Sequence, residues 1–180
     1  HKKIVAKTRD LFPEDFNFPI RKLIKKFEGL IGVSLTNINP FNGKRHRIII
    51  RINRPFSNDY NPPHKDIYES LDVYNHCPKF INFWIPISGV TSKSSLPIVP
   101  SSHLISEDKI IRTKEGAKII GQKFRVRMIK KWFESNKLQR IKIRNGDVLL
   151  FTPYLIHGLA LNENKNLTRI SLEFRLFQKN

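Results

Sequence analysis

The sequence predicts a mainly β domain, a sandwich or barrel with one or two helices packed outside. Short runs rich in β-branched and aromatic residues recur along the chain, and turn-forming Asn, Gly and Pro residues separate them, which is the pattern of an all-β fold. The chain of 180 residues is long enough for one domain with a packed interior. Since no linker or internal repeat is visible, we expect residues 1–180 to form a single domain.

The N-terminal part is expected to differ from the rest. Residues 1–19 contain two prolines and predict an irregular arm. Residues 20–31 predict a helix, because their apolar side chains recur at i, i+3, i+4 and i+7 and lysines occupy the opposite face. Residues 1–43 are therefore expected to be an N-terminal arm and helix.

Residues 44–180 are expected to form the β core. Its strands are predicted from β-branched and alternating apolar residues at 47–53, 80–87, 95–100, 138–144, 148–151 and 168–177. We expect the strand at 148–151 to be buried, because all of its residues are apolar. Residues 104–135 are rich in Lys and Arg and predict a basic insertion, a long loop with partial helix over 128–135.

The net charge of the chain is +18. It indicates either an anionic partner or the solvated basic surface of a Lys-rich protein, and the second is favoured because the cations are spread over the whole chain. The single cysteine, Cys77, excludes an intrachain disulfide and fits a reducing, cytoplasmic setting. No membrane span is expected, because no run of 18 apolar residues occurs. The first residue, His1, leaves room for a segment upstream.

A candidate metal site begins at His64-Lys65-Asp66. On an extended segment, side chains two residues apart point to the same side, so the His64 imidazole and the Asp66 carboxylate can reach one ion. His157, which follows an apolar strand, is the best candidate for a third ligand. Two histidines and one carboxylate with open positions are typical of non-haem Fe(II) oxygenases. Each residue alone is more often an ordinary loop or core residue, so the prediction depends on the combination.

Arg169 and Ser171 form a second candidate site. Arg169 opens the last predicted strand, twelve positions after His157, and Ser171 lies two residues further on the same face. A guanidinium can bind a carboxylate through two parallel hydrogen bonds, to which a hydroxyl can add a third. The pair therefore predicts a clamp for the distal carboxylate of a 2-oxo acid cosubstrate. The alternative is that Arg169 is a surface charge at a strand end.

These residues resemble the phytanoyl-CoA dioxygenase-like branch of the Fe(II)- and 2-oxoglutarate-dependent oxygenases in both order and spacing. The matching segments lie between residues 47 and 177 and are His64-Lys-Asp66, Asn82-Phe-Trp-Ile-Pro-Ile-Ser88, Leu96-Pro-Ile-Val-Pro-Ser-Ser-His103, Gly146-Asp147, His157 and Arg169-Ile-Ser171. A serine stands where the family has Gly in its Pro-Gly-Ser-His segment, a mild change in a loop.

The resemblance implies a double-stranded β-helix (jelly-roll) core. It also implies that His64, Asp66 and His157 are Fe(II) ligands and that Arg169 and Ser171 bind 2-oxoglutarate. Such an enzyme oxidises a small-molecule substrate with O2 and converts 2-oxoglutarate to succinate and CO2. Hydroxylation is favoured, because the halogenase subclass carries a small residue in place of Asp66. From charge alone, we expect the substrate to be a small polar metabolite, sugar-like or phosphorylated.

Five further residues have open roles in the sequence. Asn82 and Trp84 share one strand face and are expected either to line the cofactor pocket or to belong to the core. Lys65 points away from its two neighbours, an orientation that lets it face solvent. His103 lies in a segment that is structural in the family, and His76 is a further candidate ligand.

Two other functions compete with the oxygenase. A nucleic-acid-base demethylase of the same superfamily would suit the charge and the closing strand, but the gap of 91 residues between Asp66 and His157 is long for that branch. A nucleic-acid partner is therefore not expected. A non-catalytic basic jelly-roll module would bind no Fe(II) and would not consume 2-oxoglutarate. The sequence leaves the oligomeric state open.

Overall fold

The computed structural model describes residues 2–8, 11–16, 19–68, 77, 79–119 and 121–179. Its helices are α1 (Lys2–Lys7), α2 (Ile20–Ile31) and the short 3-10 helices η2 (Pro13–Asp15), η3 (Ser102–Leu104) and η4 (Glu107–Lys109). Its strands are β1 (Leu35–Thr36), β2 (Ile49–Asn53), β3 (Phe80–Ser88), β4 (Pro97–Ile98), β5 (Ile110–Arg112), β6 (Lys118–Ile119), β7 (Gln122–Lys123), β8 (Ile129–Trp132), β9 (Gln139–Arg140), β10 (Leu149–Phe151) and β11 (Arg169–Gln178).

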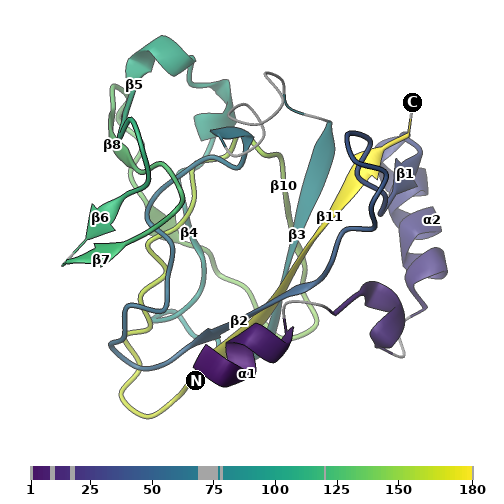
Figure 1. Ribbon diagram of the computed structural model, residues 1–180, viewed down its shortest axis with the longest axis horizontal. Helices are drawn as coiled ribbons and strands as arrows, with labels where there is room; N and C mark the ends of the chain where they lie inside the picture. Colours follow the sequence, from purple (N-terminus) through teal and green to yellow (C-terminus); the bar gives the residue numbers. More distant parts are fainter. Residues whose placement is uncertain are drawn as a thin grey trace.

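The centre of the fold is an antiparallel sheet with β11 and β3 as its long inner strands (Figure 1). β3 pairs on its other side with β10, and the other edge of β11 pairs with β1 and β2. Short pairs, β4 with β9 and β5 with β8, form a second layer across a cavity from this sheet. Single bridges from His157 to His64 and to Ile98 join that layer together. Two facing antiparallel layers are consistent with a jelly roll, so the predicted mainly β fold class is confirmed.

One face of the central sheet is covered by α2, which lies beside β1 and β11 (Figure 1). The apolar stripe of the helix packs on the sheet, with the Phe27 ring edge-on to Phe83 at 4.7 Å between centroids. The helix ends at Gly32, which takes the left-handed conformation (φ 67°) that glycine adopts without strain. The helix predicted over residues 20–31 is therefore confirmed.

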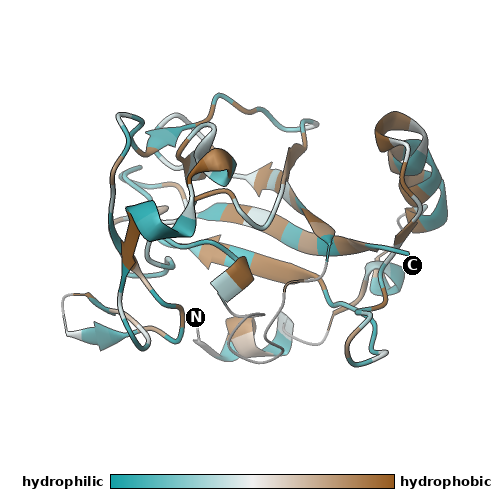
Figure 2. Ribbon diagram, turned by 90° about the horizontal axis from the view of Figure 1, so that it is seen from above, coloured by the Kyte–Doolittle hydropathy of each residue, from teal (hydrophilic) through white to brown (hydrophobic). Residues whose placement is uncertain are grey.

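The opposite face of the same sheet carries polar side chains that line a cavity. On β11, Leu172 and Leu176 belong to the cluster beneath α2, whereas Arg169, Glu173 and Arg175 line the cavity. This follows from strand geometry, in which successive side chains point to opposite faces. Figure 2 shows the alternation of hydrophilic and hydrophobic residues along β11, the strand that runs to the C-terminus. One strand thus contributes both to the apolar core and to the wall of the cavity.

The long strands were predicted well, but shorter elements were not. The strands predicted at 47–53, 80–87 and 168–177 correspond to β2, β3 and β11. The predicted strand at 138–144 is reduced to β9, and the strand at 148–151 is not fully buried, because β10 lies at the edge of the sheet with Leu150 38% exposed.

Two predictions about helices were wrong. The arm at 1–19 was expected to be irregular, yet it contains α1, which contacts β2. The segment 128–135 was expected to be partly helical, yet it contains β8, which pairs with β5. A short apolar run does not show by periodicity alone whether it forms a helix or a strand, so the pairing partner decides. Within the described part of the chain, no helix is long and apolar enough to cross a membrane.

Candidate active site

A cavity of about 530 Å³ lies between the two layers. One wall is formed by β2, β3 and β11, and the other by the segments that carry His64 and His157. α1 and the β6–β7 hairpin also contribute to its lining, through Val5 and Ala6 and through Gln122 and Phe124. A cavity of this size suits a small molecule together with a cofactor.

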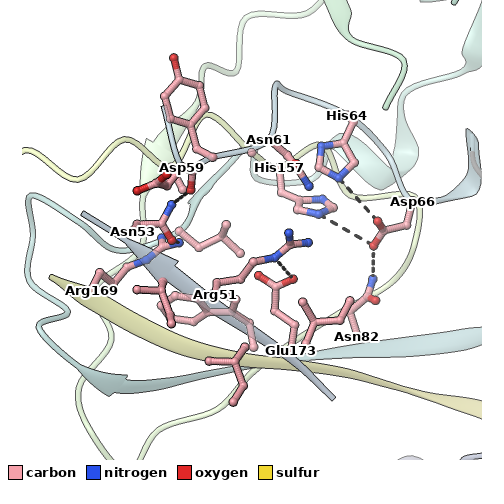
Figure 3. A pocket seen from close by; sticks show the side chains of 18 of the residues that line it. Arg51, Asn53, Asp59, Asn61, His64, Asp66, Asn82, His157, Arg169 and Glu173 are labelled. Atoms are coloured by element: carbon pink, nitrogen blue, oxygen red, sulfur yellow. Dashed lines mark hydrogen bonds and ion pairs between the residues drawn. The ribbon is translucent and has the colours of Figure 1, made fainter. Parts of the chain in front are cut away.

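Three buried side chains, His64, Asp66 and His157, converge on this cavity (Figure 3). Nε2 of His64 lies 3.6 Å from Oδ1 of Asp66, and Nε2 of His157 lies 3.8 Å from Oδ2. One ligand atom from each residue lies within 4.8 Å of the others, so the three can hold a metal ion. The sequence thus placed all three candidate ligands correctly beside one another, whereas His76 lies outside the described residues and His103 is exposed.

The backbone fixes the relative positions of the two histidines. The amide of His64 donates to the carbonyl of His157 at 2.9 Å, and the amide of His157 donates to the carbonyl of His64 at 3.0 Å. Gly158 makes this approach feasible: its φ is 124°, and a Cβ there would lie 2.4 Å from the carbonyl oxygen of Pro62. Lys65 points to the other side, but the prediction that it faces solvent was wrong, since it is 1% exposed.

Each imidazole is also oriented through its second nitrogen. Nδ1 of His64 lies 2.6 Å from the carbonyl of Pro62, and Nδ1 of His157 lies 3.0 Å from the carbonyl of Leu155. A proton on Nδ1 leaves Nε2 free as a ligand atom, which is the common arrangement at metal sites. Burial, with the neighbouring His64, lowers the pKa of His157 to about 4, so its imidazole is neutral at pH 7.

Asp66 is held by two polar side chains from the central sheet. Nδ2 of Asn82 donates to Oδ2 of Asp66 at 2.8 Å, and Nη2 of Arg175 lies 2.9 Å from Oδ1. Arg175 also donates through Nε to Oδ1 of Asn82 at 3.1 Å. Burial by itself would raise the pKa of Asp66, but the Arg175 guanidinium and the two imidazoles hold it well below its usual range. The cavity therefore contains an ionised carboxylate fixed beside the imidazoles of His64 and His157.

Arg169 lies on a different part of the cavity wall and is 2% exposed. Its Nη1 donates to the carbonyl of Ser94 at 3.1 Å, and its Nη2 donates to Oδ1 of Asn53. Its Nε is buried and has no hydrogen-bond partner. Burial lowers the pKa of Arg169 to about 10, so it is still charged at pH 7.

Ser171 lies two residues after Arg169 on β11 and is not among the residues that line the cavity, whereas Trp84 of β3 is. The hydroxyl of Ser171 and Nε1 of Trp84 are buried without hydrogen-bond partners, and the Arg169 guanidinium lies 5.8 Å from the Trp84 ring. Trp84 lines the cavity and also packs with Leu96 and Ala160, so it is both a pocket and a core residue. Asn82 lines the cavity too, but its hydrogen bond goes to Asp66. Unsatisfied buried donors are rare in native proteins and indicate a missing partner.

Residues 5–170 match the protein family described as phytanoyl-CoA dioxygenase (PhyH), which is nearly the whole chain. The chain belongs to the phytanoyl-CoA dioxygenase family. Members of this family are Fe(II)- and 2-oxoglutarate-dependent oxygenases, so the resemblance noted in the sequence is confirmed.

A solved structure with a similar fold is that of AviO1 from Streptomyces viridochromogenes Tue57. The two chains superpose with a TM-score of 0.52 and share 17% sequence identity. The match covers 87% of this chain and 57% of AviO1, so this chain spans a little more than half the length of that protein. At this identity the likeness supports the fold alone. No curated protein matches the chain.

Sequence reasoning missed several polar residues of this phytanoyl-CoA dioxygenase-family site. Arg175 and Glu173 continue the two-residue period of Arg169 and Ser171 on β11, so strand alternation could have found them. Nε of Arg51 donates to Oε2 of Glu173 at 2.9 Å inside the cavity (Figure 3). Asn53, which accepts a hydrogen bond from Arg169, could not be recognised from the sequence pattern. Its position beside Arg169 depends on the register of β2 against β11.

Replacing Asn82 with alanine is expected to weaken metal binding, because the Asp66 carboxylate loses the amide that orients it. Loss of such a supporting hydrogen bond costs roughly 10- to 100-fold in metal affinity. Anaerobic titration with Fe(II) would measure the change. Asn58→Ala, which alters an exposed amide of the same cavity, is the matched control and should bind Fe(II) as wild type does. Equal affinities of the two variants would contradict the role given to Asn82.

His46 makes the stability of the metal-free protein depend on pH. Burial, together with Arg175 and Arg47, lowers the pKa of His46 from 6.5 to about 4. Between these values the unfolded chain binds a proton that the folded chain does not, so stability falls as the pH drops through this window. When the pH drops from 7 to 5, the unfolding free energy of the wild type should fall by about 1–2 kcal/mol more than that of His46→Gln. Urea denaturation at the two pH values would measure this, and parallel losses would refute it.

Proposed function

We propose that residues 1–180 form one oxygenase domain that uses Fe(II), O2 and 2-oxoglutarate to hydroxylate a small-molecule substrate. The observation that carries the proposal is the pairing of two features in one cavity: the His64, Asp66 and His157 cluster, and the buried Arg169 guanidinium with unsatisfied donors around it. Membership of the phytanoyl-CoA dioxygenase family supports the same reaction class.

The three-residue cluster suits Fe(II). Two imidazoles and one carboxylate are the facial triad of non-haem Fe(II) oxygenases, and three protein ligands leave positions for a cosubstrate and O2. Bound Fe(II) would supply the activation of O2. The chain contributes an ionised Asp66 and a neutral His157, so neither of these two ligands needs to lose a proton at pH 7 before a cation binds. Arg175 and Asn82 keep the Asp66 carboxylate in place.

The Arg169 region suits a bound 2-oxoglutarate molecule, whose distal carboxylate would face the guanidinium. Among the described residues, no carboxylate forms an ion pair with Arg169, whose hydrogen-bond acceptors are the neutral oxygens of Ser94 and Asn53. A buried cation without a counter-charge is costly, which favours an anionic ligand. Nε of Arg169 and the Ser171 hydroxyl are donors available for it. We infer that these two residues bind the cosubstrate and that Trp84 forms part of its wall.

The decisive experiment measures succinate formed from 2-oxoglutarate under air, with and without added Fe(II). Wild type should form succinate only with Fe(II), even without substrate, because uncoupled turnover tests the site itself. His64→Ala should be inactive, and His103→Ala, which removes an exposed histidine outside the site, should match wild type. A wild-type protein that binds no Fe(II) and consumes no 2-oxoglutarate would favour a non-catalytic binding module.

For the substrate, we infer a small polar metabolite with an anionic group, sugar-like or phosphorylated. Inside the cavity, Glu173 is paired with Arg51 and Asp66 with Arg175, so the interior suits an uncharged polar part of the substrate. Cations gather instead on the β6–β7 hairpin at the cavity rim, where Lys118, Lys123 and Arg125 are exposed. The hairpin reaches the cavity through Phe124, whose ring stacks on Tyr60 at 6.3 Å.

Charge reversal on the hairpin tests this substrate class. A substrate would first be found by screening pools of sugars and sugar phosphates for extra succinate. Lys123→Glu/Arg125→Glu should then raise the KM for an anionic substrate at least tenfold and leave the KM for the cosubstrate unchanged, because the hairpin cations act at the rim. Lys25→Glu/Lys26→Glu on the exposed face of α2 makes the same charge change far from the cavity and should have no effect. An unchanged substrate KM in the hairpin variant would exclude this role.

A further inference from the structure

Lys65 stands between two of the proposed metal ligands and is one of the most deeply buried side chains of the domain, at 1% exposure. Its ammonium donates to the carbonyl of Ile105 at 3.2 Å and to Oε1 of Glu107 at 2.8 Å. Both partners lie in the segment that includes η3 and η4 at the start of the basic insertion. A fully buried lysine is rare, so its retention at this position calls for a reason.

We propose that Lys65 is a positioning residue for the metal centre. It ties the ligand-bearing segment to the η3–η4 segment and so fixes where His64 and Asp66 present their ligand atoms. The inference rests on the proposed function, because it concerns the same three ligands. It goes beyond that function by giving the metal site a support outside the cavity, in the basic insertion.

The ligand segment is held from three directions. The main chain of His64 pairs with His157 through two hydrogen bonds, and the amide of Ile129 in β8 donates to the carbonyl of Pro63 at 2.8 Å. These two contacts fix the start of the segment. The amide of Asp66 donates to the carbonyl of Pro153 at 3.0 Å, which fixes its end. Lys65 supplies a side-chain contact at the midpoint, directed away from the ligands.

The chemistry of the contact explains why an apolar residue would not replace it. An aliphatic side chain could fill the space among the apolar neighbours, but it could not donate to the Ile105 carbonyl or reach the Glu107 carboxylate. Removing one partner of a buried ion pair is destabilising mainly because it leaves the other charge buried and unpaired. Glu107 is half exposed, so water can solvate its carboxylate when the lysine is removed. Lys65 is therefore expected to matter more for the placement of His64 and Asp66 than for folding.

The test compares Lys65→Met with Lys109→Met. Lys109 lies in η4 and pairs with Glu134 at 3.2 Å, but on the surface, so the second variant makes the same substitution in the same region without touching the ligand segment. Co(II) serves as a spectroscopic probe, and Fe(II) is titrated anaerobically. Lys65→Met is expected to bind both ions at least tenfold more weakly, with altered Co(II) absorption bands, while Lys109→Met matches wild type. Thermal unfolding of the metal-free proteins reports any effect on folding.

Two further variants test the contact between Lys65 and Glu107 from its two sides. Lys65→Arg retains a cationic donor and should restore most of the metal affinity. Glu107→Gln retains a hydrogen-bond acceptor and should lose less metal affinity than Lys65→Met does. Unchanged Co(II) spectra and affinity in Lys65→Met would overturn the inference while leaving the oxygenase proposal intact. The inference would also be overturned if Lys65→Met lost metal affinity only in proportion to a loss of folding stability and Lys65→Arg did not restore the affinity. A wild-type protein that binds neither ion would instead refute the proposed function.

Discussion

Replacing Asp66 with alanine is expected to abolish Fe(II)-dependent succinate formation and to weaken Fe(II) binding by at least about 100-fold. The variant leaves only the two imidazoles as ligands and no anion to offset the charge of the ion. It also leaves Arg175, which lies 2.9 Å from Asp66 in the wild type, as an unpaired cation beside the site. Anaerobic Fe(II) titration and succinate formation measure the two effects separately.

The control for this variant is Asp147→Ala. Asp147 is an exposed aspartate in the turn before β10, so the same substitution there should leave both measurements unchanged. Asp66→Glu keeps the charge but moves the carboxylate by one methylene and should retain part of the Fe(II) affinity. Full activity in Asp66→Ala would show that the cluster of His64, Asp66 and His157 does not hold the metal.

Replacing Arg169 with methionine is expected to raise the KM for the cosubstrate, 2-oxoglutarate, by roughly 100-fold or more. The variant removes a buried charge and the hydrogen bonds that we propose it makes to the cosubstrate, each of which would be worth about 1.5–3 kcal/mol. Fe(II) affinity should change little, because Arg169 is not among the three clustered ligands. Uncoupled succinate formation at increasing 2-oxoglutarate concentration measures the KM, and anaerobic titration measures the metal affinity.

Arg140 offers a matched control for Arg169. Arg140 donates to the carbonyls of Ser95 and Leu161, as Arg169 does to that of Ser94, but it lies outside the cavity lining. Arg140→Met should therefore keep the wild-type KM. Arg169→Lys retains the charge without the planar fork and should fall between wild type and Arg169→Met. If Arg169→Met and Arg140→Met raise the KM for 2-oxoglutarate equally, Arg169 supports the fold and does not bind the cosubstrate directly.

The site could be predicted from the sequence where its signal is local. His64 and Asp66 are two residues apart on an extended segment, which directs both side chains to one side, and the structure brings them within 3.6 Å. Arg169 and Ser171 share a strand face by the same rule. His157 lies 91 residues after Asp66, so its selection depended on its place after an apolar strand and on the resemblance to a family rather than on local spacing.

The residues that support the ligands could not be predicted in this way. Arg175 meets Asp66 because β11 pairs with β3 in a particular register, and a shift of one residue would turn its side chain toward α2. The direction of Lys65 was predicted correctly, but not its burial, since that depends on the segment around η3 and η4 folding over it. The basic insertion was predicted to be a long loop. Its strands β5 and β8 form by pairing with each other, and neither segment shows a clear strand pattern in its own sequence.

The sequence by itself determined the mainly β fold class, the helix at residues 20–31, the long strands and the three clustered ligand candidates, because each of these depends on a short-range period or on a motif. Only the tertiary structure decided which polar groups surround them: the Arg175 and Asn82 contacts to Asp66, the pairing of Arg51 with Glu173, and the burial of Lys65. The physical reason is that these contacts join strands distant in sequence, so they are set by sheet register and by packing across the cavity.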